Sequence, residues 1–263
     1  MSEAQPDFID VNGANIAVRH RPGRKAPGVV WLGGYRSDML GTKAVVLDEW
    51  AQKTGHPALR LDYSGHGESG GDFNQGTISR WLDESLAVYA KYAQGPQILV
   101  GSSMGGWIAL RMAQELKKAG NSPAGIVLIA PAPDFTAELV EPSLTEAQKR
   151  DLVEKGYFEE PSEYSPNPYI YTRTLIEDGR QNLVLKGIIE TGCPVHILQG
   201  MLDEAVPYQH VLKLVEHLPV DDVTLTLVRD GDHRLSRPQD LDLLIRTVSS
   251  LAERVAGLVS GKE

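Results

Sequence analysis

The fold is decided by the stretch Gln97-Ile98-Leu99-Val100-Gly101-Ser102-Ser103-Met104-Gly105-Gly106-Trp107. It opens with a largely apolar run, passes through the pattern Gly-x-Ser-x-Gly at residues 101–105, and continues into a helix-compatible run that reaches residue 113. This order of strand, sharp turn and helix is typical of a nucleophile elbow, which lifts a serine hydroxyl clear of a sheet edge. Glycine on either side of the serine lets the backbone bend tightly. The stretch therefore predicts that Ser103 is a covalent nucleophile.

The same pattern occurs a second time, at residues 67–71. A polar turn at residues 63–66 precedes it, and the polar residues 72–76 follow it. Because neither a strand nor a helix flanks this copy, we interpret it as a turn without a nucleophile.

Outward from the elbow, short apolar runs alternate with helix-like segments, which is typical of βαβ units and a mostly parallel sheet. An Asn12-Gly13 pair between two short apolar runs indicates an opening hairpin over residues 8–18. The patterns predict strands at residues 27–32, 58–62, 97–100, 125–129, 194–198 and 223–228, and helices at residues 43–53, 78–92, 207–217 and 238–258. We therefore expect an α/β fold with a mostly parallel central sheet flanked by helices.

The alternation breaks at Ala130-Pro131-Ala132-Pro133, and no buried run of strand length follows before residue 191. Residues 134–190 consist instead of amphipathic pieces and a proline-rich stretch. We interpret them as a small helical cap inserted over the carboxyl edge of the sheet. The core would then comprise residues 1–133 and 191–263, in a single domain overall.

Composition excludes several classes of protein. A net charge of -9 over 263 residues argues against a nucleic-acid-binding role, because phosphate contacts need clustered Lys and Arg. The sequence has no apolar run long enough for a membrane span, and residues 1–7 lack the apolar core of a signal peptide. Its one cysteine, Cys193, fits a reducing compartment and a buried structural thiol. We expect a cytoplasmic protein with no stable membrane anchor.

Two further residues complete a possible catalytic constellation. A serine hydroxyl needs a base within hydrogen-bond distance, and a carboxylate that orients this base. Asp203 follows the strand expected at residues 194–198, and His233 follows the strand expected at residues 223–228. The carboxyl ends of parallel strands meet at one edge of a sheet, and the order Ser, Asp, His is the one used by α/β hydrolases.

Each of these residues also has a simpler interpretation. Asp203 alone could be a helix cap or turn acid, and His233 alone could be a polar loop histidine. Glu204 is the nearest alternative to Asp203. His66 follows a strand too, and we expect it to have a structural role in its turn rather than to line the mouth of the site.

An acyl-transfer site also needs donors for the oxyanion. We expect them to be the backbone N–H groups of Met104, directly after the serine, and of Tyr35, in the loop after the first buried strand, with Gly34 as the alternative to Tyr35. Arg36 either reaches the substrate or forms a surface ion pair. No histidine pair, cysteine cluster or acidic loop has the spacing of a metal site, and no glycine-rich turn reads as a nucleotide fingerprint, so no cofactor is expected.

Several stretches carry a resemblance to a known family: Gly41-Thr42-Lys43-Ala44, Asp62-Tyr63-Ser64-Gly65, residues 95–107, Gly200-Met201-Leu202-Asp203 and Asp232-His233-Arg234. With them the chain resembles the α/β-hydrolase superfamily over its whole length, and more narrowly the bacterial relatives of mitochondrial palmitoyl-protein thioesterases that also act as acyl-glucuronide esterases. The resemblance implies a Ser103, Asp203 and His233 triad acting on carboxylic esters or thioesters of small molecules or acylated proteins.

Two other hypotheses are compatible with this fold. One is a ligand receptor without catalysis, which predicts that a member of the triad is missing or displaced. The other is a peptidase or a C–C bond hydrolase, which the cap would distinguish. The sequence does not indicate the oligomeric state.

Overall fold

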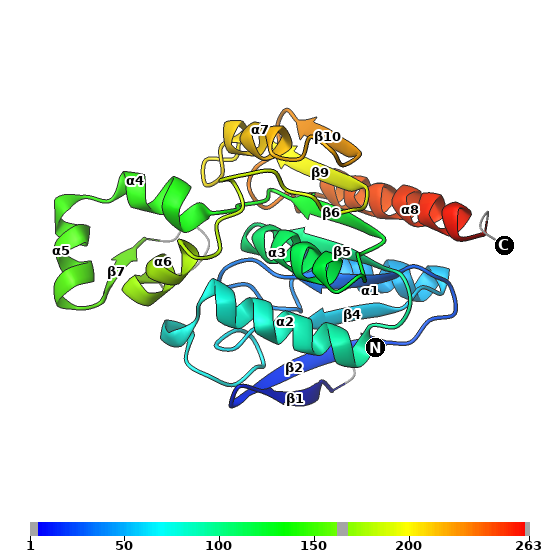
Figure 1. Cartoon of the computed structure of the whole chain (residues 1–263), viewed down its shortest axis with the longest axis horizontal. Coiled ribbons are helices and arrows are strands. Elements are labelled where there is room, and N and C mark those ends of the chain that lie inside the picture. Colours follow the sequence, from blue (N-terminus) through cyan, green and yellow to red (C-terminus); the bar gives the residue numbers. More distant parts are fainter. Residues whose placement is uncertain (1–4, 162–167, 261–263) are drawn as a thin grey trace.

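The computed structural model of the chain describes residues 5–161 and 168–260. Its centre is an eight-stranded sheet in which β1 pairs antiparallel with β2, β2 pairs antiparallel with β4, and all other neighbours are parallel. Figure 1 shows β1 and β2 at one edge and β10 at the other. In sheet order the strands are β1 (Asp7–Val11), β2 (Ala14–Arg21), β4 (Ala58–Leu61), β3 (Gly28–Leu32), β5 (Gln97–Ser102), β6 (Gly125–Ile129), β9 (Val195–Gly200) and β10 (Val223–Val228).

Helices cover both faces of this sheet. The buried apolar residues form two clusters, and the side chains of β3 alternate between them, with Val30 and Leu32 in one cluster and Val29 and Trp31 in the other. Because both faces are covered, all five residues of β3 are buried, which explains the continuous apolar runs in the sequence. On the first face lie α2 (Ile78–Tyr92), α3 (Met104–Lys118) and α7 (Tyr208–Glu216), and on the second lie α1 (Thr42–Thr54) and α8 (Pro238–Ser260).

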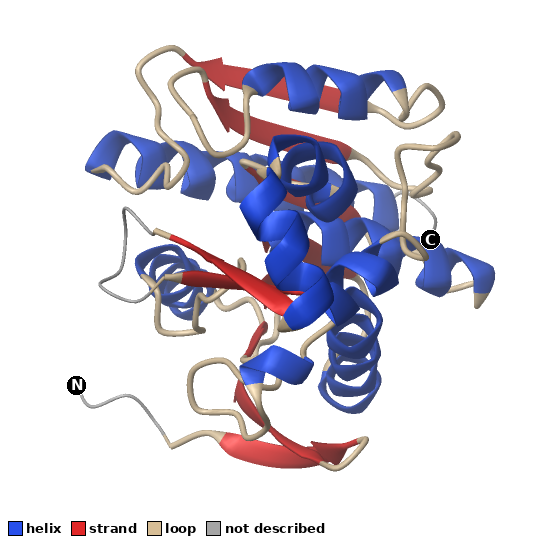
Figure 2. Cartoon of the chain, turned by 90° about the vertical axis from the view of Figure 1, so that its left-hand side faces the viewer, coloured by secondary structure: helices blue, strands red, loops and turns tan. Residues whose placement is uncertain are grey.

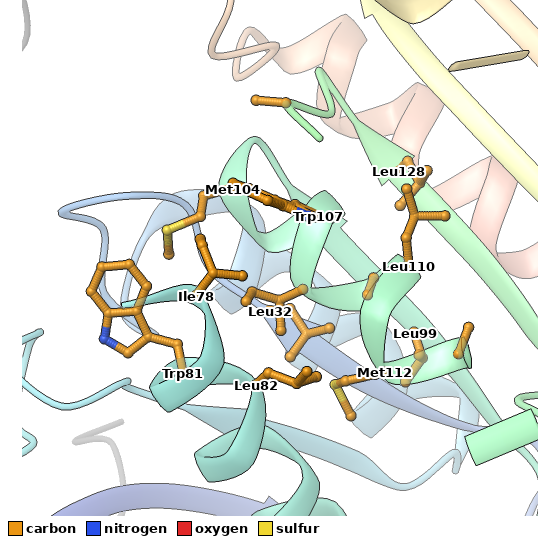
Figure 3. Packing of buried hydrophobic residues seen from close by; sticks show 14 of the residues in the cluster. Leu32, Ile78, Trp81, Leu82, Leu99, Met104, Trp107, Leu110, Met112 and Leu128 are labelled. Carbon is orange, nitrogen blue, oxygen red and sulfur yellow. The ribbon is translucent and has the colours of Figure 1, made fainter. Parts of the chain in front are cut away.

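The helix α2 shows how local sequence and packing agree. Thr77 caps its amino end by accepting a hydrogen bond from the backbone N–H of Arg80. Apolar residues at three- to four-residue spacing place one side of α2 in the core. In Figure 3, Ile78 of α2 lies next to Leu32 of β3 and Met104 of α3. The helix has the bounds that its periodicity predicts.

The described residues 134–161 and 168–179 of the insertion project from one end of the sheet (Figure 1). They contain a π-helical turn (Thr136–Val140), α4 (Glu141–Ser143), α5 (Glu146–Glu154) and α6 (Arg173–Gly179). They also contain an antiparallel pair of strands, β7 (Tyr157–Glu160) and β8 (Tyr169–Thr172), which Figure 2 shows in front of the main sheet.

The insertion, expected to form a small helical cap, thus contains a pair of strands besides its helices. The strand β7 has four residues, of which only Phe158 is buried, and this is too few buried positions for a strand pattern to be recognised in the sequence. The division into a core and a cap stays a prediction about domains. Within the described ranges, no helix combines the length and the apolar character that crossing a bilayer requires.

The short 3-10 helix η1 (Phe73–Gln75) follows the second Gly-x-Ser-x-Gly copy. The hydroxyl of Ser69 in this copy accepts a hydrogen bond from Ala17 N–H at 2.8 Å and donates one to the Asp62 carbonyl at 2.7 Å. Ser69 thus connects the turn at residues 67–71 to β2 and to the end of β4, which agrees with the structural role that its flanking sequence indicates.

Candidate active site

Ser103 lies at the sharp turn between β5 and α3, with a φ of 54° and a ψ of -120°. Non-glycine residues rarely adopt this conformation, and they do so mostly at functional sites. The turn is tight enough to demand glycine on both sides. A Cβ atom at Gly101 would lie 2.3 Å from the Gly105 carbonyl oxygen, and one at Gly105 would lie 2.1 Å from the Leu32 carbonyl oxygen.

The structure brings Ser103, His233 and Asp203 together. His233 Nε2 lies 3.1 Å from the Ser103 hydroxyl oxygen, and His233 Nδ1 lies 2.8 Å from Asp203 Oδ2. A carboxylate only accepts, so Nδ1 carries the proton and Nε2 is left to accept the serine proton. The side chain of Asp203 is fully buried, whereas Glu204, the alternative acid, is exposed. This arrangement can activate an alcohol as a nucleophile.

The carboxylate of Asp203 is fixed by two donors besides His233. The backbone N–H of Val206 donates to Oδ1 at 2.8 Å, and the side-chain amide of Gln199 donates to Oδ2 at 3.1 Å. Gln199 is fully buried in β9, and its amide also donates to the carbonyls of Gly200 and Val206. Sequence reasoning missed this residue, although an amide directly after the apolar residues Ile197 and Leu198, and four residues before the acid, is an unusual choice.

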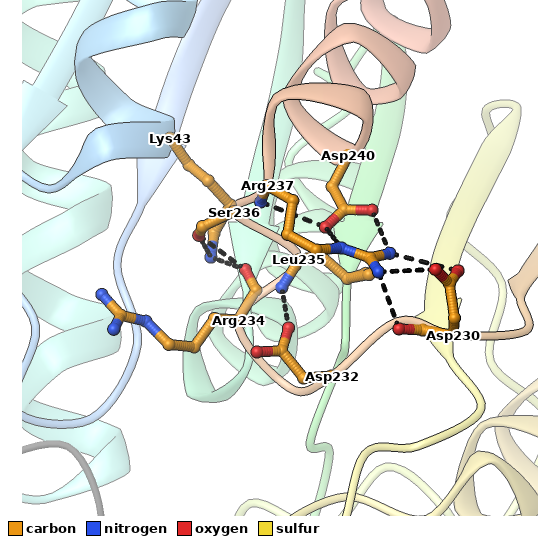
Figure 4. Close-up of polar contacts among 8 residues, drawn as sticks. All are labelled: Lys43, Asp230, Asp232, Arg234, Leu235, Ser236, Arg237 and Asp240. Atoms are coloured by element: carbon orange, nitrogen blue, oxygen red, sulfur yellow. Dashed lines mark hydrogen bonds and ion pairs between the residues drawn. The ribbon is translucent and has the colours of Figure 1, made fainter.

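The loop that carries His233 is held from two sides (Figure 4). Arg237 bridges the carboxylates of Asp230 and Asp240. From α1, the ammonium group of Lys43 donates to the carbonyl of Arg234, directly after the histidine. Burial lowers the pKa of Lys43 to about 8. These contacts limit the freedom of the imidazole and support its alignment with Ser103.

The two expected oxyanion donors lie beside Ser103. Met104 begins α3, so its N–H has no partner within the helix. The loop after β3 passes so close that a Cβ atom at Gly34 would lie 3.3 Å from the Ser103 Cβ. Across the described part of the chain, neither Met104 N–H nor Tyr35 N–H donates to a protein acceptor. Both donors are therefore available to a ligand.

Arg36 points elsewhere. Its guanidinium group lies 5.0 Å from the centre of the Phe73 ring and donates to the carbonyl of Pro168. It does not line the cavity at Ser103, so its contact with substrate stays a prediction.

A cavity of about 150 Å³ opens at Ser103 and His233. Its wall is largely apolar and includes four tyrosine and phenylalanine rings, of which those of Tyr35 and Tyr171 stack with their centres 5.5 Å apart. No Asp, Glu, Lys or Arg is among the described residues around it, which are Tyr35, Ser103, Met104, Ala132, Phe135, Leu139, Val140, Tyr169, Tyr171, Ala205, Val206 and His233. No pattern in the sequence predicted the five lining residues that the insertion contributes, between Phe135 and Tyr171.

A metal site finds no support in the described ranges. Among residues 5–161 and 168–260, no three His, Cys, Asp or Glu side chains are grouped so that they could hold an ion.

Comparison with known proteins gives a consistent result. Residues 26–242 match the alpha/beta hydrolase family. The mitochondrial palmitoyl-protein thioesterase ABHD10 of Mus musculus is 35% identical over 246 residues, covering 93% of this chain and 81% of the relative. The Homo sapiens protein of the same name is 31% identical over 252 residues, covering 94% and 79%.

Two solved structures are also similar over nearly their whole length. A protein from Agrobacterium vitis S4 is 57% identical with a TM-score of 0.91, covering 95% of this chain and 98% of that one. The mouse alpha/beta hydrolase domain-containing protein 10 is 32% identical with a TM-score of 0.85, covering 96% and 100%.

Proposed function

The chain belongs to the alpha/beta hydrolase family, and from this premise we propose that it is a serine hydrolase that cleaves carboxylic esters or thioesters through an acyl-enzyme. The observation that carries the proposal is the continuous line of hydrogen bonds from Asp203 through His233 to Ser103. The relatives named as thioesterases support the same reaction class.

In the proposed reaction, Ser103 Oγ attacks the carbonyl carbon while His233 Nε2 takes the hydroxyl proton. Asp203 stabilises the imidazolium that forms. The N–H groups of Met104 and Tyr35 donate hydrogen bonds to the oxyanion of the tetrahedral intermediate. His233 then protonates the departing alcohol or thiol, which leaves an ester on Ser103, and a water molecule releases the acid by the same steps.

The cavity supports a compact and uncharged acyl group. Its volume of about 150 Å³ is comparable to cavities that hold one benzene ring. The relatives are named for palmitoyl-protein substrates, so we propose that a long acyl chain would require the wall formed by Tyr169 and Tyr171 to move. The relatives are also named mitochondrial, and for this chain a cytoplasmic location stays a prediction.

A fluorophosphonate probe tests the nucleophile. It should label the native protein and fail to label Ser103→Ala. Ser69→Ala is the matched control, because Ser69 lies in the same sequence pattern but its hydroxyl is engaged by the backbone of the sheet edge. Equal labelling of native protein and Ser103→Ala would contradict the proposal. So would hydrolysis of p-nitrophenyl acetate that persists in His233→Ala.

A further inference from the structure

The loop that carries Tyr35 N–H contains a strained turn. The Ser37 N–H donates to the Gly34 carbonyl at 3.1 Å, which closes a turn over residues 34–37. Arg36, the third residue of this turn, has a φ of 57°. Turns that need a positive φ at this position usually have glycine there. Something outside the turn must therefore favour this conformation of Arg36.

His66 supplies that contact. Its Nε2 lies 3.1 Å from the backbone nitrogen of Arg36, and its Nδ1 lies 3.2 Å from the Ser64 carbonyl oxygen. A carbonyl only accepts, so Nδ1 carries the proton and Nε2 accepts from Arg36. The two contacts thus require the same tautomer, and both are satisfied at once.

The surroundings of His66 keep it in this neutral form. The residue is 4% exposed, and its ring packs against those of Tyr63, Phe73 and Trp81. Burial lowers the pKa of His66 to about 4, with the charge of Arg36 acting in the same direction. An imidazolium could not accept the Arg36 hydrogen bond, so a neutral ring is a condition for the contact.

We propose that His66 is a positioning residue, which holds residues 34–37 so that the N–H of Tyr35 faces the oxyanion formed at Ser103. The inference depends on the proposed serine-hydrolase function. The Gly34 carbonyl points into the turn toward Ser37, and a trans peptide is planar, so the Tyr35 N–H points out of the turn. The hydrogen bond from Arg36 N–H to His66 holds the peptide between Tyr35 and Arg36. It thereby also orients the neighbouring peptide, which carries the Tyr35 N–H.

A purely structural role for His66 in its own turn explains less. That turn has other hydrogen bonds, from Gly65 N–H to the Gly70 carbonyl and from Glu68 N–H to the Asp62 carboxylate. The Nδ1 contact alone would serve the turn. The Nε2 contact reaches 30 residues along the chain to the loop beside the serine.

Two pairs of variants separate positioning from packing. His66→Phe keeps an aromatic ring but removes the acceptor. His66→Gln can present an oxygen at the distance of Nε2, whereas the shorter His66→Asn cannot reach it. His56→Phe is the matched control, since His56 also packs against a tryptophan and contacts a backbone carbonyl, but lies beside Trp50 on the other face of the sheet.

The readouts are kcat and KM for p-nitrophenyl acetate and inhibition by a trifluoromethyl ketone, which forms an oxyanion on the serine. Loss of one oxyanion donor costs roughly 100-fold in kcat, so we expect about that loss in His66→Phe and His66→Asn, with KM within about threefold. Inhibition by the ketone should weaken by the same factor. His66→Gln should recover at least about tenfold of the loss, and His56→Phe should match the native protein.

Two results would overturn the proposal. If His66→Gln and His66→Asn lose the same activity, or if the ketone binds all folded variants equally well, His66 does not act through the oxyanion donor. This pair of polar variants decides the question even if His66→Phe fails to fold. Ser103→Ala is measured beside them: turnover that survives in it refutes the serine hydrolase itself, whereas turnover lost in it but kept in the His66 variants refutes only the positioning role.

Discussion

Replacing Asp203 by Asn tests how much of the proposed catalysis comes from one buried charge. The asparagine has the same shape but no charge, so it cannot stabilise the imidazolium that forms when His233 takes the serine proton. The two groups lie 2.8 Å apart, and the carboxylate is fully buried. With an effective dielectric constant of about 20, their attraction is about 6 kcal/mol. This corresponds to a loss of roughly four orders of magnitude in kcat, with KM little changed.

The assay is hydrolysis of p-nitrophenyl acetate by purified Asp203→Asn, with a thermal melt to show that the protein is folded. Glu204→Gln is the matched control, because this neighbouring acid is exposed and its loss should change kcat by less than about twofold. If Asp203→Asn keeps activity within about tenfold of the native protein, the reasoning fails. A large loss in Glu204→Gln would instead assign the acid to the alternative residue.

Three further changes have outcomes that follow from the structure. Tyr171→Ala removes part of the aromatic wall of the cavity, so the ratio of octanoate to acetate hydrolysis should rise by about tenfold, as a p-nitrophenyl ester series would measure. Ser103→Gly removes the hydroxyl and should abolish turnover. It also relieves the strain of a positive φ, which costs about 1–3 kcal/mol, and after the extra chain entropy of glycine is subtracted the free energy of unfolding should rise by about 1 kcal/mol. An unchanged or lower melting temperature would contradict this. Burial raises the pKa of Asp134 to about 6, so the folded state binds a proton at this carboxyl more tightly than the unfolded state does. The free energy of unfolding therefore falls as the pH rises from about 4 to 6 and the carboxyl ionises. Asp134→Asn should remove this decline, which urea unfolding at pH 4.5 and 7 would detect as a difference of up to about 2 kcal/mol from the native protein.

Sequence pattern predicted the inner strands of the central sheet well because these strands are buried on both faces. The inner strand β6 and the helix α2 have the predicted bounds, and so does the edge strand β10, whose residues are half-buried or exposed. In such elements local pattern and tertiary burial agree, so a run of apolar residues has one interpretation. The insertion lacks this agreement. The strands β7 and β8 have four residues each, and pairing with one another, rather than burial of a face, defines them.

The candidate site shows the same division. Ser103, Asp203 and His233 could be proposed together because each follows a strand, and parallel strands end at a common edge. The roles of Gln199 and Tyr171 could not, because they depend on contacts between segments that are distant in the chain. The stacking of Tyr171 on Tyr35, for example, joins residues separated by 136 positions in the printed sequence.

Backbone strain also marks the candidate active site, independently of its side-chain chemistry. In the described part of the chain, the non-glycine residues with positive φ, apart from the hairpin residue Asn12, are Arg36, Ser103, Ala130, Asp134 and Leu235. All five lie in the loops at the carboxyl ends of β3, β5, β6 and β10 that surround the cavity. Each such residue costs about 1–3 kcal/mol, so together they approach the entire net stability of about 5–15 kcal/mol of a typical domain. Local contacts offset this cost, as the Asp134 carboxylate does by accepting from the N–H groups of Val184 and Leu185. Strain concentrated at one edge of the sheet is the pattern expected where geometry serves a reaction rather than the fold.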